Sequence, residues 1–268
     1  VRRWRRVPYV EASPLPPHST PPTMPTTIRP TPAALPAAVP AAPSAVPATY
    51  ALSGPAILDL AAELLRGGLV PEAMELLATG LRAVRGELAP DAWATFATRT
   101  CAEHPVAALL REDPLTGRCA AQPRGYAGDA GTLDLIYRAV PLPDDTTALG
   151  AAVHAYSVEA PACRAVRWRR DHLARTLDAA AARVERPRVL SVACGHLREL
   201  ERSRAALDGR LGPVLALDQD ARSLAYVRDA HAERGVTTLP GSVRDILAGR
   251  VVVEGMDVAY AAGLYDYL

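Results

Sequence analysis

The stretch Arg188–Glu199 (RVLSVACGHLRE) constrains the fold of this chain more than any other. It contains an apolar run, Val189–Ala193, that is too short for a helix and ends at Cys194-Gly195. Helically spaced apolar residues follow directly. The pattern predicts a strand, a tight glycine turn and a helix, which together form the first half of a nucleotide-binding βαβ unit. Such a turn lets the backbone approach a ligand and directs helix N–H groups towards it. A buried parallel strand that simply ends in glycine would give the same local pattern.

Strand and helix patterns alternate through the remainder of the chain. Strands are expected at Val189–Ala193, Val214–Leu217, Val236–Leu239 and Met256–Tyr260. The intervening helices are expected at Leu197–Leu207, Arg222–Arg234 and Val243–Leu247. Alternation of this kind predicts an α/β fold with a parallel sheet and right-handed crossovers.

Two further regions precede the first strand. Residues 1–50 are mainly Pro, Ala, Thr and Ser, and prolines at this density predict a disordered tail with polyproline character. Residues 51–182 predict an α-helical unit, and residues 183–268 hold the strand pattern. Within the unit we expect one helix over Ile57–Leu65, others opening at Pro71 and Pro90, and two more between residues 146 and 182.

Composition gives no support to several function classes. The chain has 268 residues, a net charge of +1 and 49% hydrophobic residues, which gives no argument for nucleic acid or an anionic membrane as a partner. The arginine-rich helix expected before residue 182 is typical of a solvated surface, with His172 as a surface or packing residue. The four cysteines are widely spaced, so we expect no metal site and reduced thiols in a cytoplasmic protein. No apolar run reaches about 18 residues, so no membrane span is expected.

A glycine-rich segment, residues 113–130, interrupts the helical unit. We expect a long loop there, and long loops in compact domains are often functional. It gathers Arg124, Tyr126 and Asp129 between glycines. Asp129 also has the alternative interpretation of an N-cap for a helix over Leu133–Arg138.

The second strand ends in Leu217-Asp218-Gln219-Asp220. Asp218 lies roughly twenty residues past Gly195, near the offset at which an acidic residue meets ribose hydroxyls in such folds. Asp220 is better explained as a helix N-cap. A dinucleotide pyrophosphate needs several glycines, and here Gly195 stands alone. S-adenosylmethionine has no phosphate, so the pattern favours that cofactor over NAD.

The third and fourth crossovers agree with this interpretation. Ser242 and Val243 follow the third strand, where an adenine could pack on Val243 and hydrogen-bond to Ser242 or to the backbone. The fourth strand runs into Ala261-Ala262-Gly263, and its carboxyl end should face the transferred methyl group.

Together these segments resemble the class I S-adenosylmethionine-dependent methyltransferases. The resemblance rests on Val189–Glu199, Leu217–Asp220, Gly241–Arg244 and Asp257–Tyr267. With Pro123–Ala130 (PRGYAGDA), the chain is similar to a bacterial subgroup, some members of which are linked to methyl esters of 3-hydroxy fatty acids used as extracellular signals. The resemblance covers roughly residues 105–268. It implies a Rossmann-like sheet and methyl transfer from S-adenosylmethionine to a small molecule, such as the carboxylate of a hydroxy fatty acid.

The resemblance also implies roles for individual residues. Ala193 and Gly195 would line the methionine part of the cofactor, Asp218 the ribose, and Ser242 with Val243 the adenine. Gln219 would also contact the cofactor. Ala261, Gly263 and Tyr265 would lie near the sulfonium, with Tyr126 and Asp129 folding over cofactor or substrate. If the acceptor needs a base, the candidates are Tyr126, Tyr265, Asp266 and His196.

The sequence departs from the family pattern D-x-G-x-G-x-G at three positions. Ser191, Ala193 and Leu197 replace the acid and two of the glycines, and Glu199 or Asp129 could supply the missing carboxylate for the methionine amino group. The chain also ends soon after the fourth strand, so the resemblance implies a truncated fold. The fourth strand then leaves an unpaired edge, which keeps open a non-catalytic cofactor-binding or regulatory module, or an inactive fragment. A nicotinamide oxidoreductase is disfavoured by the missing glycines.

Overall fold

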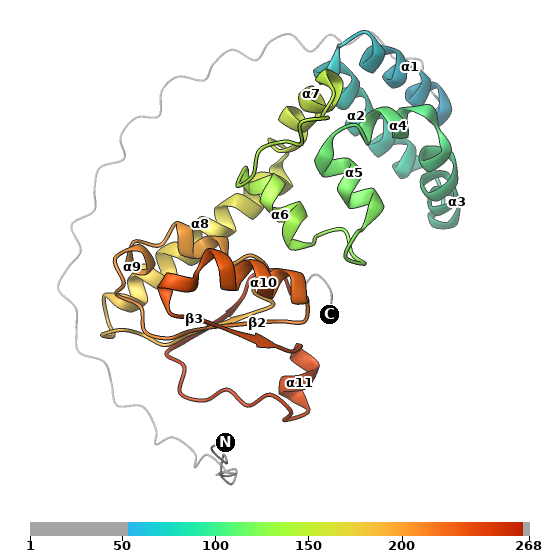
Figure 1. Cartoon of the computed structure of the whole chain (residues 1–268). Helices are drawn as coiled ribbons and strands as arrows, with labels where there is room; N and C mark the ends of the chain where they lie inside the picture. The colour runs from blue at the N-terminus through green and yellow to red at the C-terminus, as the bar shows by residue number, and fades with distance from the viewer. Residues whose placement is uncertain (1–52, 265–268) are drawn as a thin grey trace, which may run out of the picture. The chain divides into compact units, whose positions relative to one another are not determined.

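The computed structural model describes residues 53–264 (Figure 1). The expected proline-rich tail, residues 1–50, lies outside the described residues, as do two candidate catalytic residues, Tyr265 and Asp266. None of the helices between residues 53 and 264 is long and apolar enough to cross a membrane.

The first part of the described chain is helical, and the helices expected there are confirmed. Proline occupies the first turn of six of them, where its fixed φ suits the helix and its missing N–H is not needed. The elements are α1 (Gly54–Arg66), α2 (Val70–Glu87), α3 (Pro90–Thr95), the π-helical turn η1 (Phe96–Cys101), α4 (Pro105–Leu110), α5 (Pro114–Ala121), α6 (Ala130–Tyr137), α7 (Ala148–Ser157) and α8 (Pro161–Ala181).

Two apolar clusters stabilise these helices. The larger one joins α1, α2, α4 and α7 through buried Leu58, Leu65, Leu77, Val106 and Val153. The smaller one joins α5, α6 and the end of α7, and residues of α8, the helix that precedes β1, pack against it. Its buried members are Leu115, Leu135, Ile136 and Val158.

The expectation of an uninterrupted loop over residues 113–130 is wrong, because α5 occupies its first half. Asp113 caps this helix by accepting a hydrogen bond from the Leu115 N–H at 2.8 Å, and Pro114 fills the first turn. Gly117 sits inside α5 because a Cβ there would lie 2.6 Å from the Arg111 carbonyl oxygen. The glycine that suggested a loop therefore serves close helix packing, and only residues 122–129 remain irregular.

The four expected strands are confirmed and form a parallel sheet in the order β3-β2-β1-β4. Val192 at the end of β1 is level with Leu217 of β2 and Ala261 of β4, so the carboxyl ends of these strands meet at one edge. The strands are β1 (Val189–Val192), β2 (Val214–Asp218), β3 (Val236–Pro240) and β4 (Val258–Ala261).

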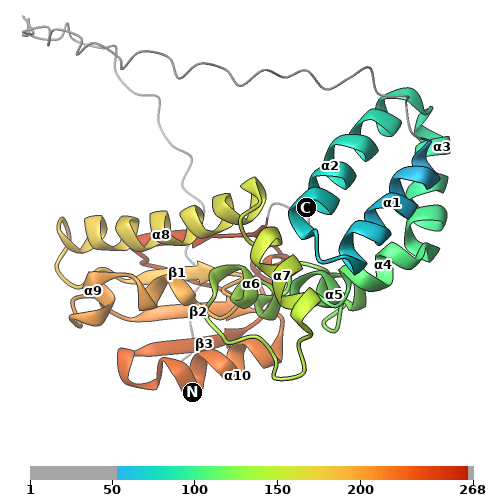
Figure 2. The same cartoon turned by 90° about the horizontal axis from the view of Figure 1, so that it is seen from above.

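Short helices connect the strands. Figure 1 shows α9 and α10 on one face of the sheet and α11 on the other, and Figure 2 shows α8 running alongside β1. Leu177 of α8, Val189, Leu200 and Val227 belong to the core under α8–α10. The connections contain the 3₁₀ turns η2 (Arg198–Glu201) and η3 (Ala232–Arg234) and the helices α9 (Arg204–Leu207), α10 (Ala221–Ala230) and α11 (Val243–Leu247).

The single helix expected over Leu197–Leu207 is broken into η2 and α9. Leu197 adopts φ 55°, which a helix cannot contain, and Ser203 starts a new helix by accepting from the Ala206 N–H at 3.1 Å. Asp178 of α8 fixes this restart by accepting from both Ser203 Oγ (2.7 Å) and the Ala205 N–H (2.8 Å). Among the described residues, no long helix follows the glycine turn and directs its N–H groups at it, contrary to our expectation.

Candidate functional site

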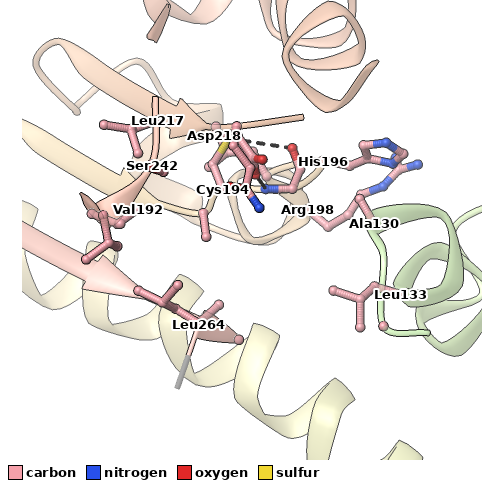
Figure 3. Close-up of a pocket in the computed structure, with 18 of the residues that line it drawn as sticks. Ala130, Leu133, Val192, Cys194, His196, Arg198, Leu217, Asp218, Ser242 and Leu264 are labelled. Carbon is pink, nitrogen blue, oxygen red and sulfur yellow. Dashed lines mark hydrogen bonds between the residues drawn. The ribbon is translucent and has the colours of Figure 1, made fainter. Parts of the chain in front are cut away.

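A cavity of about 530 Å³ opens at the carboxyl edge of the sheet and is called here the carboxyl-edge cavity (Figure 3). Its volume lies within the range of about 300–1,000 Å³ that is typical of small-molecule sites. Figure 3 shows Val192, Leu217 and Ser242 on one side and Ala130 and Leu133 of α6 on the other. The residues that line the cavity come from segment 122–129, from α6 and from the loops that follow the four strands. They are Tyr126, Gly128, Ala130, Leu133, Asp134, Tyr137, residues 192–199, residues 217–219, residues 241–244 and residues 262–264.

The turn after β1 has an unusual backbone. Ala193, Gly195 and Leu197 have φ values of 53°, 54° and 55°, so every second residue is left-handed. Glycine adopts this conformation freely, whereas an L-residue with a side chain is strained there by about 1–2 kcal/mol. Strain of this kind persists only where the surroundings enforce it, and it concentrates at functional sites. These three positions are also where the methyltransferase pattern has its glycines.

Asp218 joins this turn to the end of β2. Its Oδ2 accepts from the Gly195 N–H and its Oδ1 from the Asp220 N–H, both at 2.8 Å. The residue is 7% exposed and lines the cavity. A carboxylate can accept about four hydrogen bonds, so acceptor capacity remains on each oxygen for a ligand. Gln219, also expected in the site, lines the cavity beside it.

The loop after β3 contributes Ser242 and Val243 to the cavity wall, as the sequence predicts. Asp245 holds this loop, because its Oδ2 accepts from both the Ser242 N–H and the Ser242 hydroxyl at 2.7 Å. These hydrogen bonds and the nearby Arg250 lower the pKa of Asp245 to about 2. Asp245 is therefore ionised at physiological pH and can accept both hydrogen bonds from Ser242.

After β4, the lining residues are Ala262, Gly263 and Leu264. Gly263 was expected in the site and is there. Ala261, the last residue of β4, was also expected but is not among the lining residues. The cavity wall begins one residue later than the sequence suggested.

Glu199 is a buried carboxylate in the cavity wall. It is 6% exposed, and its Oε1 accepts a hydrogen bond from the Tyr260 hydroxyl at 2.5 Å. Burial raises the pKa of Glu199 above its ordinary value, and burial together with the Glu199 charge raises the pKa of Tyr260. The Glu199 carboxyl group is thus shielded from water, and a cationic group of a ligand would stabilise its ionised form.

Asp129 is held away from the cavity. It is fully buried, caps α6 by accepting from the Thr132 N–H at 2.9 Å, and accepts two hydrogen bonds from Arg118, each at 2.9 Å. The capping interpretation of Asp129 is confirmed, and the residue is not among those that line the cavity. Its carboxylate is occupied by structural partners and does not meet a ligand there.

Tyr126 does line the cavity, as expected. Burial, and then the charges of Asp218, Asp220 and Asp129, raise its pKa to about 12. At neutral pH the phenol therefore keeps its proton. This places Tyr126 better as a hydrogen-bonding wall residue than as the base that the sequence suggested.

His196 lines the cavity but is enclosed by partners. Its Nδ1 lies 2.8 Å from Asp134 Oδ2, its Nε2 lies 3.5 Å from an Arg124 nitrogen, and its ring stacks on Tyr226 at 4.2 Å. Asp134 also accepts two hydrogen bonds from Arg198 at 2.8 Å. These bonds hold the pKa of Asp134 below its ordinary value although burial acts to raise it.

The α6 contribution was missed by sequence reasoning. Asp134 and Tyr137 come from a segment that was predicted only as a helix, together with the apolar Ala130 and Leu133. Asp134 was the available signal, since a carboxylate at a position that faces the core requires a buried partner. Its partners, His196 and Arg198, are more than sixty residues away in the sequence.

Comparisons of the chain with protein-family models, curated proteins and solved structures found no match. Among residues 53–264, no group of three His, Cys, Asp or Glu side chains could hold a metal ion. Function must therefore be argued from the carboxyl-edge cavity itself.

Proposed function

We propose that the chain binds S-adenosylmethionine in the carboxyl-edge cavity, on a Rossmann-like sheet, and transfers its methyl group to a small molecule. The observation that carries the proposal is the left-handed backbone at Ala193, Gly195 and Leu197. Two of these residues have side chains that oppose this conformation, yet the turn keeps it. Glycine adopts this backbone without strain, so the turn supports the resemblance at the positions where the residues themselves differ from the glycines of the pattern.

The hydrogen-bonding groups of the cavity fit the cofactor. Asp218 is oriented by two backbone N–H groups and keeps acceptor capacity for the vicinal hydroxyls of a ribose. Ser242 and Val243 line the wall expected to hold the adenine. The single glycine at Gly195 offers no cradle for a pyrophosphate, so a nicotinamide dinucleotide fits less well.

The family pattern has an acidic residue where this chain has Ser191, and Glu199 would supply the missing carboxylate. Asp129, the other candidate, is occupied by Arg118 and by the α6 cap. A buried carboxylate is stabilised by a neighbouring cation, and S-adenosylmethionine carries both an ammonium and a sulfonium group. We therefore assign the methionine end of the cofactor to the Glu199 side of the cavity.

The reaction would be an in-line displacement, in which bound S-adenosylmethionine supplies an electrophilic methyl group. Catalysis then consists mainly of holding the acceptor in line with the methyl group, about 3 Å away. A carboxylate acceptor is ionised at neutral pH and needs no base, which agrees with the protonated state of Tyr126. The apolar wall formed by Leu133 and Leu264 suits an aliphatic acceptor such as a hydroxy fatty acid. The four free cysteines agree with a reducing cytoplasmic setting.

Isothermal calorimetry with S-adenosylmethionine, S-adenosylhomocysteine and NAD tests the proposal. We expect both sulfur ligands to bind and NAD to give no signal. Asp218→Asn should weaken the binding of both sulfur ligands, whereas Asp229→Asn, on the exposed side of α10, should not. Binding of NAD alone, or of none of the three, would overturn the proposal.

A second candidate function is a non-catalytic module that binds the cofactor. It is favoured by the state of the two candidate bases in the described cavity wall, since both ring nitrogens of His196 have partners and the pKa of Tyr126 is raised to about 12. Incubation with methyl-labelled cofactor and a panel of carboxylic acids separates the two functions. Labelled ester indicates an enzyme, and binding without any labelled product indicates a module.

A further inference from the structure

Arg124 connects the irregular segment 122–129 to two loops at the carboxyl edge of the sheet. Its Nη1 donates to Asp220 Oδ2 at 2.6 Å and to Ser223 Oγ at 2.9 Å, and its Nη2 lies 3.5 Å from His196 Nε2. Its partners are 72 to 99 residues away in the sequence. One guanidinium group therefore bridges the turn after β1 and the start of α10.

Both partner loops belong to the candidate cofactor site. Asp220 donates its N–H to Asp218 Oδ1, and Ser223 Oγ donates back to Asp220 Oδ2 at 3.0 Å. His196 directly follows Gly195, whose N–H meets the other Asp218 oxygen. Arg124 is thus linked to the Asp218 carboxylate by two routes. One passes through Asp220, and the other passes through His196 and the adjacent Gly195.

The Arg124 contacts are partly shielded from water. The Arg124 side chain is 13% exposed and that of Asp220 is 15% exposed. Exposed ion pairs contribute little, whereas a shielded guanidinium with several partners imposes a defined geometry. A lysine could make one of these contacts as a point charge but could not bridge two loops with a planar fork.

The segment 122–129 is irregular, with a turn closed by the Gly125 N–H donating to the Gln122 carbonyl oxygen at 2.8 Å. Gln122 and Gly125 have left-handed φ values of 45° and 87°, and no helix or strand includes the segment. Its far end is fixed by the pairing of Asp129 with Arg118. Tyr126 and Gly128 lie between the two attachments and line the carboxyl-edge cavity.

We propose that Arg124 is a positioning residue of this site, which clamps segment 122–129 across the carboxyl edge and thereby sets Tyr126 against the cavity. The identity of the ligand in this inference rests on the proposed function. Because the clamp ties the wall of the cavity to the loop that carries Asp218, releasing it lowers the affinity for S-adenosylmethionine. The ligand itself does not touch Arg124.

Amide hydrogen exchange on the ligand-free protein tests the clamp without any assumption about the ligand. Arg124→Ala and Asp220→Asn should both speed exchange in segment 122–129 while leaving β1 and β2 protected. Asp220→Asn retains a side-chain oxygen that can accept from the Arg222 N–H and cap α10, so this variant tests the clamp even if Arg124→Ala does not fold. Arg138→Ala is the matched control, because Arg138 pairs with Glu159 on an exposed surface outside the segment.

The consequence for the site is measured by calorimetry with S-adenosylmethionine. Arg124→Ala is expected to weaken binding about tenfold, Arg124→Lys nearly as much, and Arg138→Ala not at all. Unchanged exchange in segment 122–129 in both clamp variants overturns the inference. If wild-type protein binds no S-adenosylmethionine, the proposed function fails and the exchange experiment alone decides the clamp.

Discussion

The carboxylate of Asp218 accepts a hydrogen bond from the backbone N–H of Gly195, with 2.8 Å between Oδ2 and the nitrogen. The end of β2 and the turn after β1 are therefore fixed by the same contact that would orient the carboxylate towards a ribose. Because Asp220 donates to the other oxygen, Asp218 cannot be replaced by an amide without facing an N–H group with another donor. A single substitution should then affect folding and binding together.

Asp218→Asn should destabilise the protein by about 1–3 kcal/mol and weaken S-adenosylmethionine binding about tenfold or more. The amide nitrogen must meet one of the two backbone donors, and the negative charge is lost. Urea unfolding and calorimetry on the same preparation measure both effects. Asp229→Asn on exposed α10 is the control. Wild-type stability together with wild-type affinity in Asp218→Asn would contradict the assignment.

The strained turn predicts a stabilising substitution. Ala193 is half-buried with φ 53°, so Ala193→Gly relieves the left-handed strain at little cost in packing. We expect a gain of roughly 0.5–1 kcal/mol in the free energy of unfolding. Ala165→Gly, at an exposed position within α8, should instead lose about 1 kcal/mol. If the two substitutions change stability in the same direction, the strain is not there.

Sequence patterns gave the strands and most helices because their signals are local. Apolar runs bounded by proline and glycine mark β1–β4, and proline marks the helix starts. The break at Ser203 was not predictable in this way, since Asp178 of α8 enforces it from another element. The helix α5 was missed because Gly117 was interpreted as loop chemistry, whereas it serves a close approach to the Arg111 carbonyl.

The candidate site was predicted in part for the same reason. Gly195 and Asp218 lie at the ends of neighbouring parallel strands, so topology alone brings them together. Asp129 was placed in the site by resemblance, but its local role as a cap decided its position. The carboxylate of Asp134 at a core-facing position was a signal, but its pairing with His196 was missed because His196 comes from the sheet region and no local pattern identifies the partner.

Substitution of the Asp134–Arg198 ion pair should lower the free energy of unfolding strongly. The two side chains are 6% and 8% exposed, and the carboxylate accepts from both Arg198 and His196. Asp134→Asn removes the buried one of the two carboxylates that pair with Arg198, so we expect a loss of roughly 3–5 kcal/mol in urea unfolding. Glu201→Gln is the control, because Glu201 contacts the same arginine but is 33% exposed. A loss as large in the control would show that the effect does not depend on burial.

The substitution Tyr126→Phe tests whether Tyr126 is a residue of the cavity wall or a catalytic base. Because burial and nearby carboxylates raise the pKa of Tyr126 to about 12, the phenol is protonated throughout the neutral range. With a carboxylate acceptor, the variant should retain methyl transfer within about threefold, and neither protein should show a rate increase with pH between 6 and 9. A rate that rises with pH in the wild type and disappears in the variant would identify Tyr126 as a base.

Glu199 should make the free energy of unfolding fall as the pH rises. Burial raises its pKa in the folded state above the ordinary value of 4.5, so the folded protein holds this proton more tightly than the unfolded chain. The contribution is therefore fully present below pH 4.5 and is lost as the pH rises through the folded-state pKa. Glu199→Gln keeps an acceptor for Tyr260 but cannot ionise, so its stability relative to wild type should increase from pH 4.5 upward.

The same variant should bind S-adenosylmethionine more weakly at neutral pH, because the cationic methionine end loses its counter-charge. Urea unfolding from pH 4 to 8 and calorimetry at pH 7 test the two halves separately. A stability difference that does not change with pH would mean that Glu199 is ionised as readily when folded as when unfolded.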